Sequence, residues 1–199
     1  QIELRMMAHF SEDDNMVKAF CDDLDIHTAT AALIYDIDLS SVTKEQRYNA
    51  KAVNFGISYG QSAFGLSETI GVSRKEAKEI IDAYFKEFPA VKEYMDGAIE
   101  KARKDEYVET ILGRRRYLRD INSRNQTMRG FAERNAINAP IQGSAADLIK
   151  VAMIDVHNWM KKEKLKSKMI LQVHDELVFD ARKEELDQLK SMVKKNMEK

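Results

Sequence analysis

Residues 47–60 read RYNAKAVNFGISYG, and the spacing within this stretch decides how the chain around it folds. Four of its residues recur at every fourth position, namely Arg47, Lys51, Phe55 and Tyr59. Side chains spaced by four lie on one face of an α-helix, because each step of four residues advances only about 40° beyond a full turn. We therefore predict a helix over residues 44–59 that ends at Gly60.

The face formed by these four residues carries two cations followed by two aromatic rings. Ala50, Val53 and Ile57 fall on a different face, which can pack on a hydrophobic core. A nucleoside triphosphate would suit both halves of the first face, since cations bind phosphates and rings stack on base and sugar. The alternative is that these four side chains have a purely structural role. Gly56 and Gly60 would let a ligand or another backbone come close.

Outward from this helix, most of the sequence has the pattern of further helices. Ser73 and Glu76 form a capping box for a helix that ends before Pro89. Pro140 predicts a kink or a break within a long helical region, 124–163. Two more helices are expected, at 89–105 and from residue 182 to the end. Residues 107–112, Gly113 and 114–118 are expected to form a short hairpin or an extended turn. Strands are expected at 168–173 and 177–180, around a tight turn at His174-Asp175. The fold class is therefore α+β, helix-rich with a short antiparallel β-hairpin. An edge of the fold is expected to be missing, because two strands rarely form a stable sheet alone.

Composition excludes several classes of protein. The chain has 199 residues, of which 44% are hydrophobic and 33% charged, so it is neither disordered nor collagen-like. Its single cysteine rules out an internal disulfide or a Cys-rich zinc site and favours a reducing compartment. The sequence contains neither an apolar run long enough for a membrane span nor a signal peptide. Because the chain starts at Gln1 rather than Met, we expect a processed product or an excised piece.

The net charge of −1 conceals an uneven distribution of charge. Residues 1–45 carry 3 basic and 10 acidic side chains, whereas residues 101–134 carry 10 basic and 5 acidic ones. Arginine dominates the basic block and binds phosphate in a planar, bidentate manner. On charge alone, a solvated helical face is the simpler interpretation of this block. The block is also compatible with a polyanionic partner, but does not by itself indicate one. Its arginines are Arg114, Arg115, Arg116, Arg119, Arg124, Arg129 and Arg134.

A second group of functional side chains lies between the two predicted strands near the C-terminus. His174, Asp175 and Glu176 are flanked by apolar residues on both sides. Adjacent carboxylates held on a rigid hairpin can ligate Mg²⁺, which prefers hard oxygen ligands, and two such ions can organise a phosphoryl displacement. The alternative is that these are ordinary turn residues. A Mg²⁺ site would also need a carboxylate from elsewhere in the fold.

Six segments, taken together and in order, resemble the family A DNA polymerases of the bacterial DNA polymerase I type. The resemblance runs across essentially all 199 residues. The segments are Gln1-Ile-Glu-Leu-Arg5, Asp25-Ile-His-Thr28, the Arg47–Gly60 helix motif, Gly113-Arg-Arg-Arg-Tyr117, Ala139-Pro-Ile-Gln-Gly-Ser-Ala-Ala-Asp147 and Val173-His-Asp-Glu176.

The resemblance implies a role in nucleotide binding for several side chains. Arg47, Lys51 and His27 would hold the incoming triphosphate, and Lys51 would also serve as a general acid toward the pyrophosphate leaving group. Phe55 would stack near the base and sugar of the incoming dNTP. Tyr59 would sit at the templating-base end of the helix. Glu3 would be the steric gate against a ribose 2′-OH, hydrogen-bonded to Tyr59.

The resemblance also implies contacts with primer–template DNA and with metal. Asp175, with Glu176 beside it, would be a catalytic ligand of Mg²⁺, the implied cofactor. His174 would lie near the primer terminus. Contacts with the DNA backbone or the primer would come from Arg114, Arg115 and Arg116, and contacts with the minor groove of the primer–template duplex from Arg134, Asn138 and Gln142. Minor-groove acceptors are shared by all correct base pairs, so these side chains could check pair shape without reading sequence.

By the same resemblance, residues 1–40 would be part of the palm and the lead-in to the fingers. Residues 41–120 would be the fingers, and residues 121–199 the palm, with a Pro-kinked helix, a β-hairpin and a terminal helix. The family's first motif begins with Asp-Tyr-Ser before the Gln that matches Gln1, and that Asp, a metal ligand, is not in this chain. We therefore expect a fragment with little or no polymerase activity alone. Its parent protein is expected to be a cytoplasmic monomer without a membrane partner.

Two alternative functions are weighed against this one. A single-subunit RNA polymerase would have a similar architecture, but Glu3 and the Phe55-Gly56 pair argue against an enzyme that accepts a 2′-OH. A catalytically inactive nucleic-acid-binding module would bind DNA regardless of Mg²⁺ or dNTP. Replacing Lys51 with Ala would leave the DNA binding of such a module unchanged.

Overall fold

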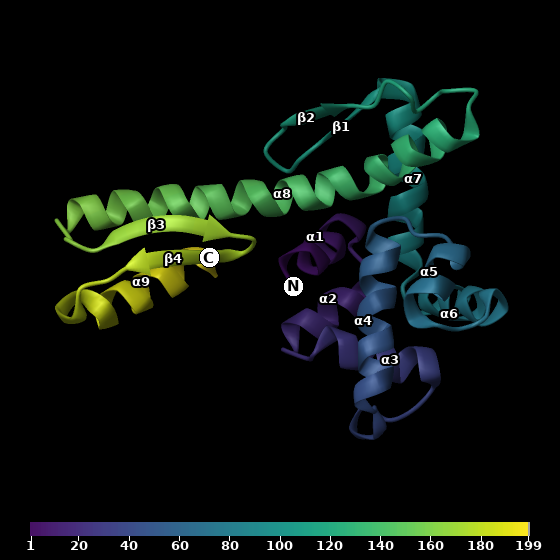
Figure 1. The fold of residues 1–199 in the computed structure, drawn as a ribbon, viewed down its shortest axis with the longest axis horizontal. Helices are drawn as coiled ribbons and strands as arrows, with labels where there is room; N and C mark the ends of the chain where they lie inside the picture. Colours follow the sequence, from purple (N-terminus) through teal and green to yellow (C-terminus); the bar gives the residue numbers. More distant parts are fainter. Residues whose placement is uncertain (199) are drawn as a thin grey trace. The chain divides into compact units, whose positions relative to one another are not determined.

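The computed structural model describes residues 1–198. They group into two compact units, residues 1–143 and the described residues from 144 onward, each described here by itself. Helix α8 (Gln126–Lys162) contributes to both units (Figure 1). The helix-rich α+β class predicted from the sequence is confirmed. The fingers and palm boundaries stay a prediction.

The first unit is mostly helical. Its helices before α8 are α1 (Ile2–Ser11), α2 (Asp14–Cys21), α3 (Ile26–Tyr35), the short 3₁₀ helix η1 (Leu39–Ser41), α4 (Lys44–Ser58), α5 (Ala63–Ile70), α6 (Arg74–Glu87) and α7 (Pro89–Asp105). The predicted helices at 44–59, 73–88 and 89–105 are confirmed as α4, α6 and α7.

Side-chain caps explain where these helices begin. The Ser73 hydroxyl accepts from the backbone N–H of Glu76, and the Glu76 carboxylate accepts from the backbone N–H of Ser73. This reciprocal pair is the predicted capping box. Thr43 and Gln46 form the same arrangement at the start of α4. Gly60, just beyond α4, has a φ of 65°, a left-handed conformation that glycine adopts without strain.

A hairpin packs beside α7 and the first part of α8. Strands β1 (Tyr107–Glu109) and β2 (Arg115–Tyr117) are antiparallel, with Tyr107 opposite Tyr117. Both strands are shorter than predicted, because residues 110–114 form the connecting loop, closed by a hydrogen bond from Gly113 N–H to the Thr110 carbonyl. Val108 and Leu118 join a buried cluster with alanines of α7 and α8.

Of the kink or break predicted at Pro140, the break is wrong, and the kink stays a prediction. Helix α8 continues through this residue without interruption. Proline removes one N–H donor from the helix, but tertiary packing holds the segment on both sides. Ala136 and Ile141 are completely buried (0% exposed), and their burial outweighs the loss of one hydrogen bond.

The second unit contains the C-terminal part of α8, a hairpin and a terminal helix. Its elements after α8 are β3 (Lys168–Val173), β4 (Glu176–Asp180), the 3₁₀ helix η2 (Lys183–Glu185) and α9 (Leu186–Met197). The predicted strands are confirmed, although β4 begins one residue earlier, at Glu176. The predicted terminal helix starts as the η2 turn and continues as α9.

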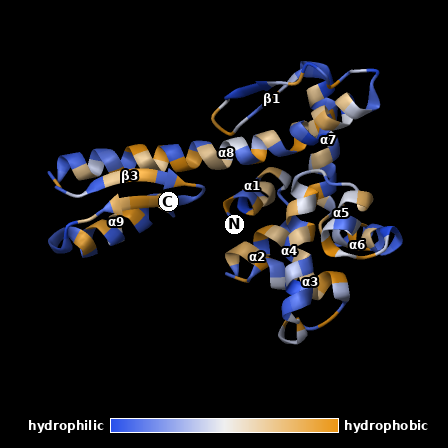
Figure 2. Ribbon diagram, in the orientation of Figure 1, coloured by the Kyte–Doolittle hydropathy of each residue, from blue (hydrophilic) through white to orange (hydrophobic). Residues whose placement is uncertain are grey.

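One face of the β3–β4 hairpin is covered and the other is exposed. Phe179 packs with Trp159 of α8 against a core formed with Leu189 of α9. The strand register pairs Leu171 with Val178, and both side chains are more than two-fifths exposed. Figure 2 shows hydrophobic residues in both strands. Among the helices of residues 1–198, none is both long and apolar enough to cross a membrane.

Candidate nucleotide and nucleic-acid site

Helix α4 displays the predicted cationic and aromatic face toward solvent. Arg47, Lys51 and Tyr59 are exposed and Phe55 is half-buried. The opposite face is buried: Ala50, Val53 and Ile57 are at most 3% exposed. This division follows from the 3.6-residue period of the sequence, and it confirms that the four side chains share the outward face of one helix. We call Arg47, Lys51, Phe55 and Tyr59 the α4 ridge.

The first residue of the ridge is held by a carboxylate from the start of α3. Asp25 caps α3 by accepting from the backbone N–H groups of His27 and Thr28. Its other oxygen accepts from Arg47 Nε at 3.0 Å and Nη2 at 2.6 Å. Burial alone would raise the pKa of Asp25, but the hydrogen bonds from Arg47 and the backbone outweigh it, so the pKa is lowered. Asp25 thus stays ionised and fixes the guanidinium beside His27.

His27 lies next to the middle of the ridge. Its ring centroid is 5.9 Å from that of Phe55, with the two rings tilted. Burial lowers the pKa of His27, Asp25 opposes that shift, and the positive charges of Arg47 and Lys51 add to it. The ring is therefore neutral at physiological pH. The packing of α3 on α4 brings this side chain together with Arg47, Lys51 and Phe55, as the sequence predicted.

The far end of the ridge is joined to α1. Tyr59 donates a hydrogen bond from its hydroxyl to Glu3 Oε2 at 2.9 Å. This contact confirms the predicted hydrogen bond between the two residues. Burial, and then the adjacent Glu3 carboxylate, raise the pKa of Tyr59 to about 12. The phenol therefore remains a donor throughout the physiological range.

The predicted minor-groove residues lie along the first part of α8. Arg134 and Gln142 are exposed, whereas Asn138 between them is half-buried. Among the described residues, Asn138 Oδ1 is buried without a hydrogen-bond partner. A Cβ added at Gly60 would lie 3.1 Å from Arg134 Cγ. The neighbour that comes close to Gly60, as expected, is therefore α8. Gly60 lies at the end of α4, so this contact places Arg134 beside that end of the α4 ridge.

The three consecutive arginines of the β1–β2 hairpin differ in their contacts. Arg114 Nη2 donates to the Gly143 carbonyl at 3.1 Å. Arg115 donates from Nε to Glu109 at 2.8 Å and lies over the ring of Tyr107. Arg116 is exposed. Arg114 and Arg115 therefore support the hairpin and its contact with α8, while Arg116 presents its charge to solvent.

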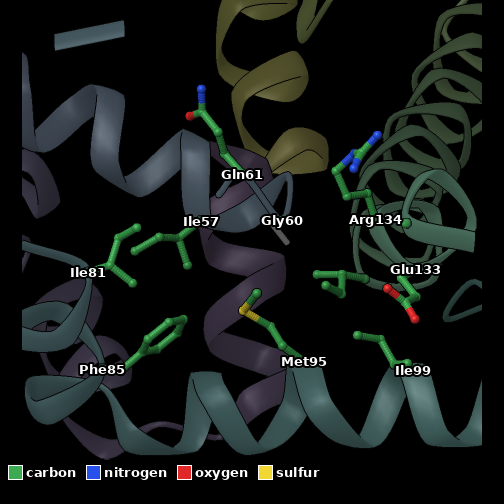
Figure 3. A pocket seen from close by; sticks show the side chains of 11 residues that line it. Ile57, Gly60, Gln61, Ile81, Phe85, Met95, Ile99, Glu133 and Arg134 are labelled. Atoms are coloured by element: carbon green, nitrogen blue, oxygen red, sulfur yellow. The ribbon is translucent and has the colours of Figure 1, made fainter. Parts of the chain in front are cut away.

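A cavity that the sequence did not predict lies behind the end of α4. It measures 230 Å³ and is bounded by residues of α4, α6, α7 and α8. Ile57 and Phe85 contribute apolar walls, and Glu133 and Arg134 lie at one side (Figure 3). Because these side chains come from four helices, no local pattern in the sequence could reveal the cavity.

In the second unit, the predicted turn at His174 and Asp175 is confirmed. His174 has a φ of 52°, and its carbonyl accepts from Gln172 Nε2 at 2.8 Å. Asp175 and Glu176 are both exposed. Within residues 1–198, no group of three or more His, Cys, Asp or Glu side chains is placed to hold a metal ion. The turn therefore offers a pair of carboxylates and no complete cage.

Comparison with known proteins settles the family. The sequence profile of DNA polymerase family A matches residues 1–199. The chain belongs to this family. It is 53% identical over 198 residues to DNA polymerase I of Caldicellulosiruptor bescii and 54% identical over 199 residues to that of Streptococcus pneumoniae strain R6. Each match covers 100% of this chain, which spans only 23% of the length of these curated relatives.

A solved structure of the family has the same fold. The POL domain of Pol1 from M. smegmatis, in complex with DNA primer-template and dNTP, superposes with a TM-score of 0.96 and is 45% identical in sequence. The match covers 99% of this chain and 35% of that domain's chain. The resemblance drawn from six short segments is thereby confirmed at the level of family and fold.

Proposed function

We propose that this chain is the nucleotide-binding and part of the catalytic region of a DNA-directed DNA polymerase, which transfers nucleotides from dNTP to a primer 3′-OH. The observation that carries the proposal is the α4 ridge. Two exposed cations and two aromatic rings lie together on one face of α4 in a family A chain, with the neutral His27 of α3 beside Phe55. The M. smegmatis relative that shares this fold is described with primer-template DNA and dNTP.

The cationic end of the ridge would bind the triphosphate. Asp25 occupies two of the five N–H donors of Arg47, so the guanidinium keeps donors for phosphate while its orientation is fixed. Lys51, one turn further along, adds a flexible ammonium that can follow the charge of the departing pyrophosphate. We propose Lys51 as the general acid for that leaving group, as the family resemblance implies.

The aromatic end would receive the base and sugar. Phe55 offers a half-buried ring that can stack on the nucleotide. The hydrogen bond from Tyr59 holds the Glu3 carboxylate against the ridge. A carboxylate fixed in this way would obstruct a ribose 2′-OH, and we propose that it selects deoxyribonucleotides.

The partner of these groups would be primer–template DNA. Arg134, Asn138 and Gln142 recur every four residues on one stripe of α8, which would let all three face the minor groove of one duplex. The exposed Arg116 would add positive charge for the phosphate backbone. Arg114 and Arg115 would add charge beside it on the same hairpin. His174, in the exposed turn of the second unit, is the candidate for contact with the primer terminus. A DNA substrate also implies a cytoplasmic location.

Family A polymerases generally use divalent metals, and the residues of the β3–β4 turn fit part of such a site. Asp175 and Glu176 are adjacent, exposed carboxylates, the hard oxygen ligands that Mg²⁺ prefers. We propose Asp175 as the principal ligand, with Glu176 beside it. Bound Mg²⁺ would stabilise the charge that develops on the phosphate oxygens. A single pair of carboxylates leaves the site incomplete, so the 199-residue chain is not expected to extend a primer alone.

The test is single-nucleotide primer extension by the full-length protein with Mg²⁺ and dNTP. Asp175→Asn removes a carboxylate charge and should lower the rate by about 100-fold or more, the cost typical of a group that stabilises transition-state charge. Asp180→Asn, at the far end of β4, is the matched control and should retain the rate. Equal rates for the two variants would contradict the assignment of Asp175. Absence of extension by the wild-type protein would contradict the proposed function itself.

A further inference from the structure

A buried amide lies behind the exposed ridge of α4. Asn54 is completely buried (0% exposed), on the same side of the helix as the buried apolar side chains of Val53 and Ile57. An amide in such a place costs free energy unless it is hydrogen-bonded. Its partners both lie on α3: the hydroxyl of Thr30 and the ring of His27.

The hydrogen-bond network determines which atoms donate. Thr30 Oγ1 lies 2.7 Å from the Ile26 carbonyl and 3.3 Å from Asn54 Oδ1, so its single proton goes to the nearer oxygen, that of Ile26. Its lone pair can then accept from Asn54 Nδ2, which is 3.0 Å away. The same nitrogen lies 3.2 Å from His27 Nδ1. The two protons of the Asn54 amide therefore satisfy Thr30 and His27, one each.

This arrangement decides the protonation of the histidine ring. A nitrogen that accepts from an amide carries no proton, so a neutral His27 holds its proton on Nε2. We propose that Asn54 is a positioning residue that keeps His27 in the Nε2–H tautomer, so that Nε2 can donate to a phosphate oxygen of the nucleotide. This inference rests on the proposed function, in which His27 contacts the triphosphate.

The tautomer matters because the ring is neutral in these surroundings. The charged groups that face His27 are Asp25 at the start of its own helix and Arg47 and Lys51 on α4. A neutral imidazole has one donor and one acceptor. In the wrong tautomer, a lone pair on Nε2 would face the phosphate oxygens, and the contact would become repulsive.

Asn54→Asp provides a test, because a carboxylate accepts from Nδ1 where the amide donates to it. Because the pKa of His27 is lowered, the ring of the wild-type full-length protein is neutral, with its proton on Nε2, over most of the range from about pH 6 to about pH 9, so KM for dNTP should vary little there. In Asn54→Asp the neutral ring holds its proton on Nδ1. KM should then rise about tenfold as the ring deprotonates, the value of one hydrogen bond to a charged group.

Asn49→Asp is the matched control. Asn49 lies on the same helix and donates to the Tyr35 hydroxyl at 3.3 Å, away from His27. Its substitution should leave the pH profile of KM flat. Equal profiles for Asn54→Asp and the wild type would overturn the proposal, since a merely structural amide would not alter which ring nitrogen titrates.

The ring tautomer can also be observed without any change at Asn54. Nitrogen-15 NMR of histidine-labelled full-length protein, with the His27 signal identified by its loss in His27→Gln, should show a protonated Nε2 at neutral pH. A protonated Nδ1 would overturn the proposal even if Asn54→Asp failed to fold. His27→Ala tests the contact between His27 and the triphosphate independently of the tautomer. If it leaves KM for dNTP unchanged, the proposed contact between His27 and the triphosphate fails, whatever the tautomer.

Discussion

At the scale of single residues, the hydrogen bond between Tyr59 and Glu3 should make the free energy of unfolding decrease as the pH becomes alkaline. The pKa of Tyr59 is raised from 10.0 to about 12. A raised pKa contributes stability that is fully present below pH 10 and is lost as the pH rises toward 12. Tyr59→Phe should remove this dependence and cost about 1 kcal/mol or less near neutrality, because the pair is partly exposed.

The measurement is urea unfolding of the chain at a series of pH values. Tyr48→Phe is the matched control, since Tyr48 lies on the same helix and is 66% exposed. The difference in unfolding free energy between the wild type and Tyr59→Phe should shrink over this alkaline range. A difference that stays constant with pH would show that the hydrogen bond does not hold the phenol proton.

Glu3 should determine the preference for the deoxyribose of a dNTP over the ribose of an rNTP. Glu3→Ala removes the carboxylate that Tyr59 holds beside the ridge. In the full-length protein this change should lower the preference for dNTP over rNTP by about tenfold or more, the effect of opening a pocket that excludes one small group. Ratios of kcat/KM for paired dNTP and rNTP would measure it. Glu12→Ala, beyond the end of α1, should leave the ratio as in the wild type.

At the scale of elements, one buried carboxylate joins the starts of two helices. Asp13 is 2% exposed. It accepts from the backbone N–H of Met16 in α2 and from that of Ala90 in α7. Asp13→Ala would leave two N–H groups without their acceptor and should lower the free energy of unfolding by about 2–4 kcal/mol.

Urea unfolding would again provide the value for Asp13→Ala. The neighbouring Asp14→Ala is the control, because Asp14 is exposed and should change stability by about 0.5 kcal/mol or less. Similar losses for both variants would indicate that Asp13 acts only through the charge at the start of α2.

Local signals in the sequence predicted the elements that depend on local chemistry. The capping box at Ser73 and the fourfold spacing in α4 both appear in the structure as predicted. Of the kink or break predicted at Pro140, the break was wrong because distant contacts bury residues on both sides of the proline. The pairing of Asp25 with Arg47 and the network around Asn54 were not predicted, since both depend on how α3 packs against α4. The periodicity of α4 alone contains no information about that packing.

At the scale of the whole molecule, the second unit leaves an apolar sheet face in contact with solvent. Leu171, Val173 and Val178 are 47%, 43% and 42% exposed. Two strands alone rarely form a stable sheet, and exposed apolar patches bind hydrophobic probes. The 199-residue chain should therefore enhance the fluorescence of an anilinonaphthalene sulfonate dye, and Val178→Lys should reduce this signal by about half. Leu112→Lys, in the β1–β2 loop, should have a smaller effect; an equal effect would contradict a preferred site on the hairpin.

The central claim is that the α4 ridge binds the triphosphate of a dNTP. Its most direct test is the rate of single-nucleotide incorporation by the full-length protein carrying Lys51→Ala, compared with Lys44→Ala at the start of the same helix. We expect Lys51→Ala to lower kcat/KM for dNTP by about 100-fold or more, while Lys44→Ala stays close to the wild type. Wild-type incorporation by Lys51→Ala, or an equal loss in both variants, would contradict the account.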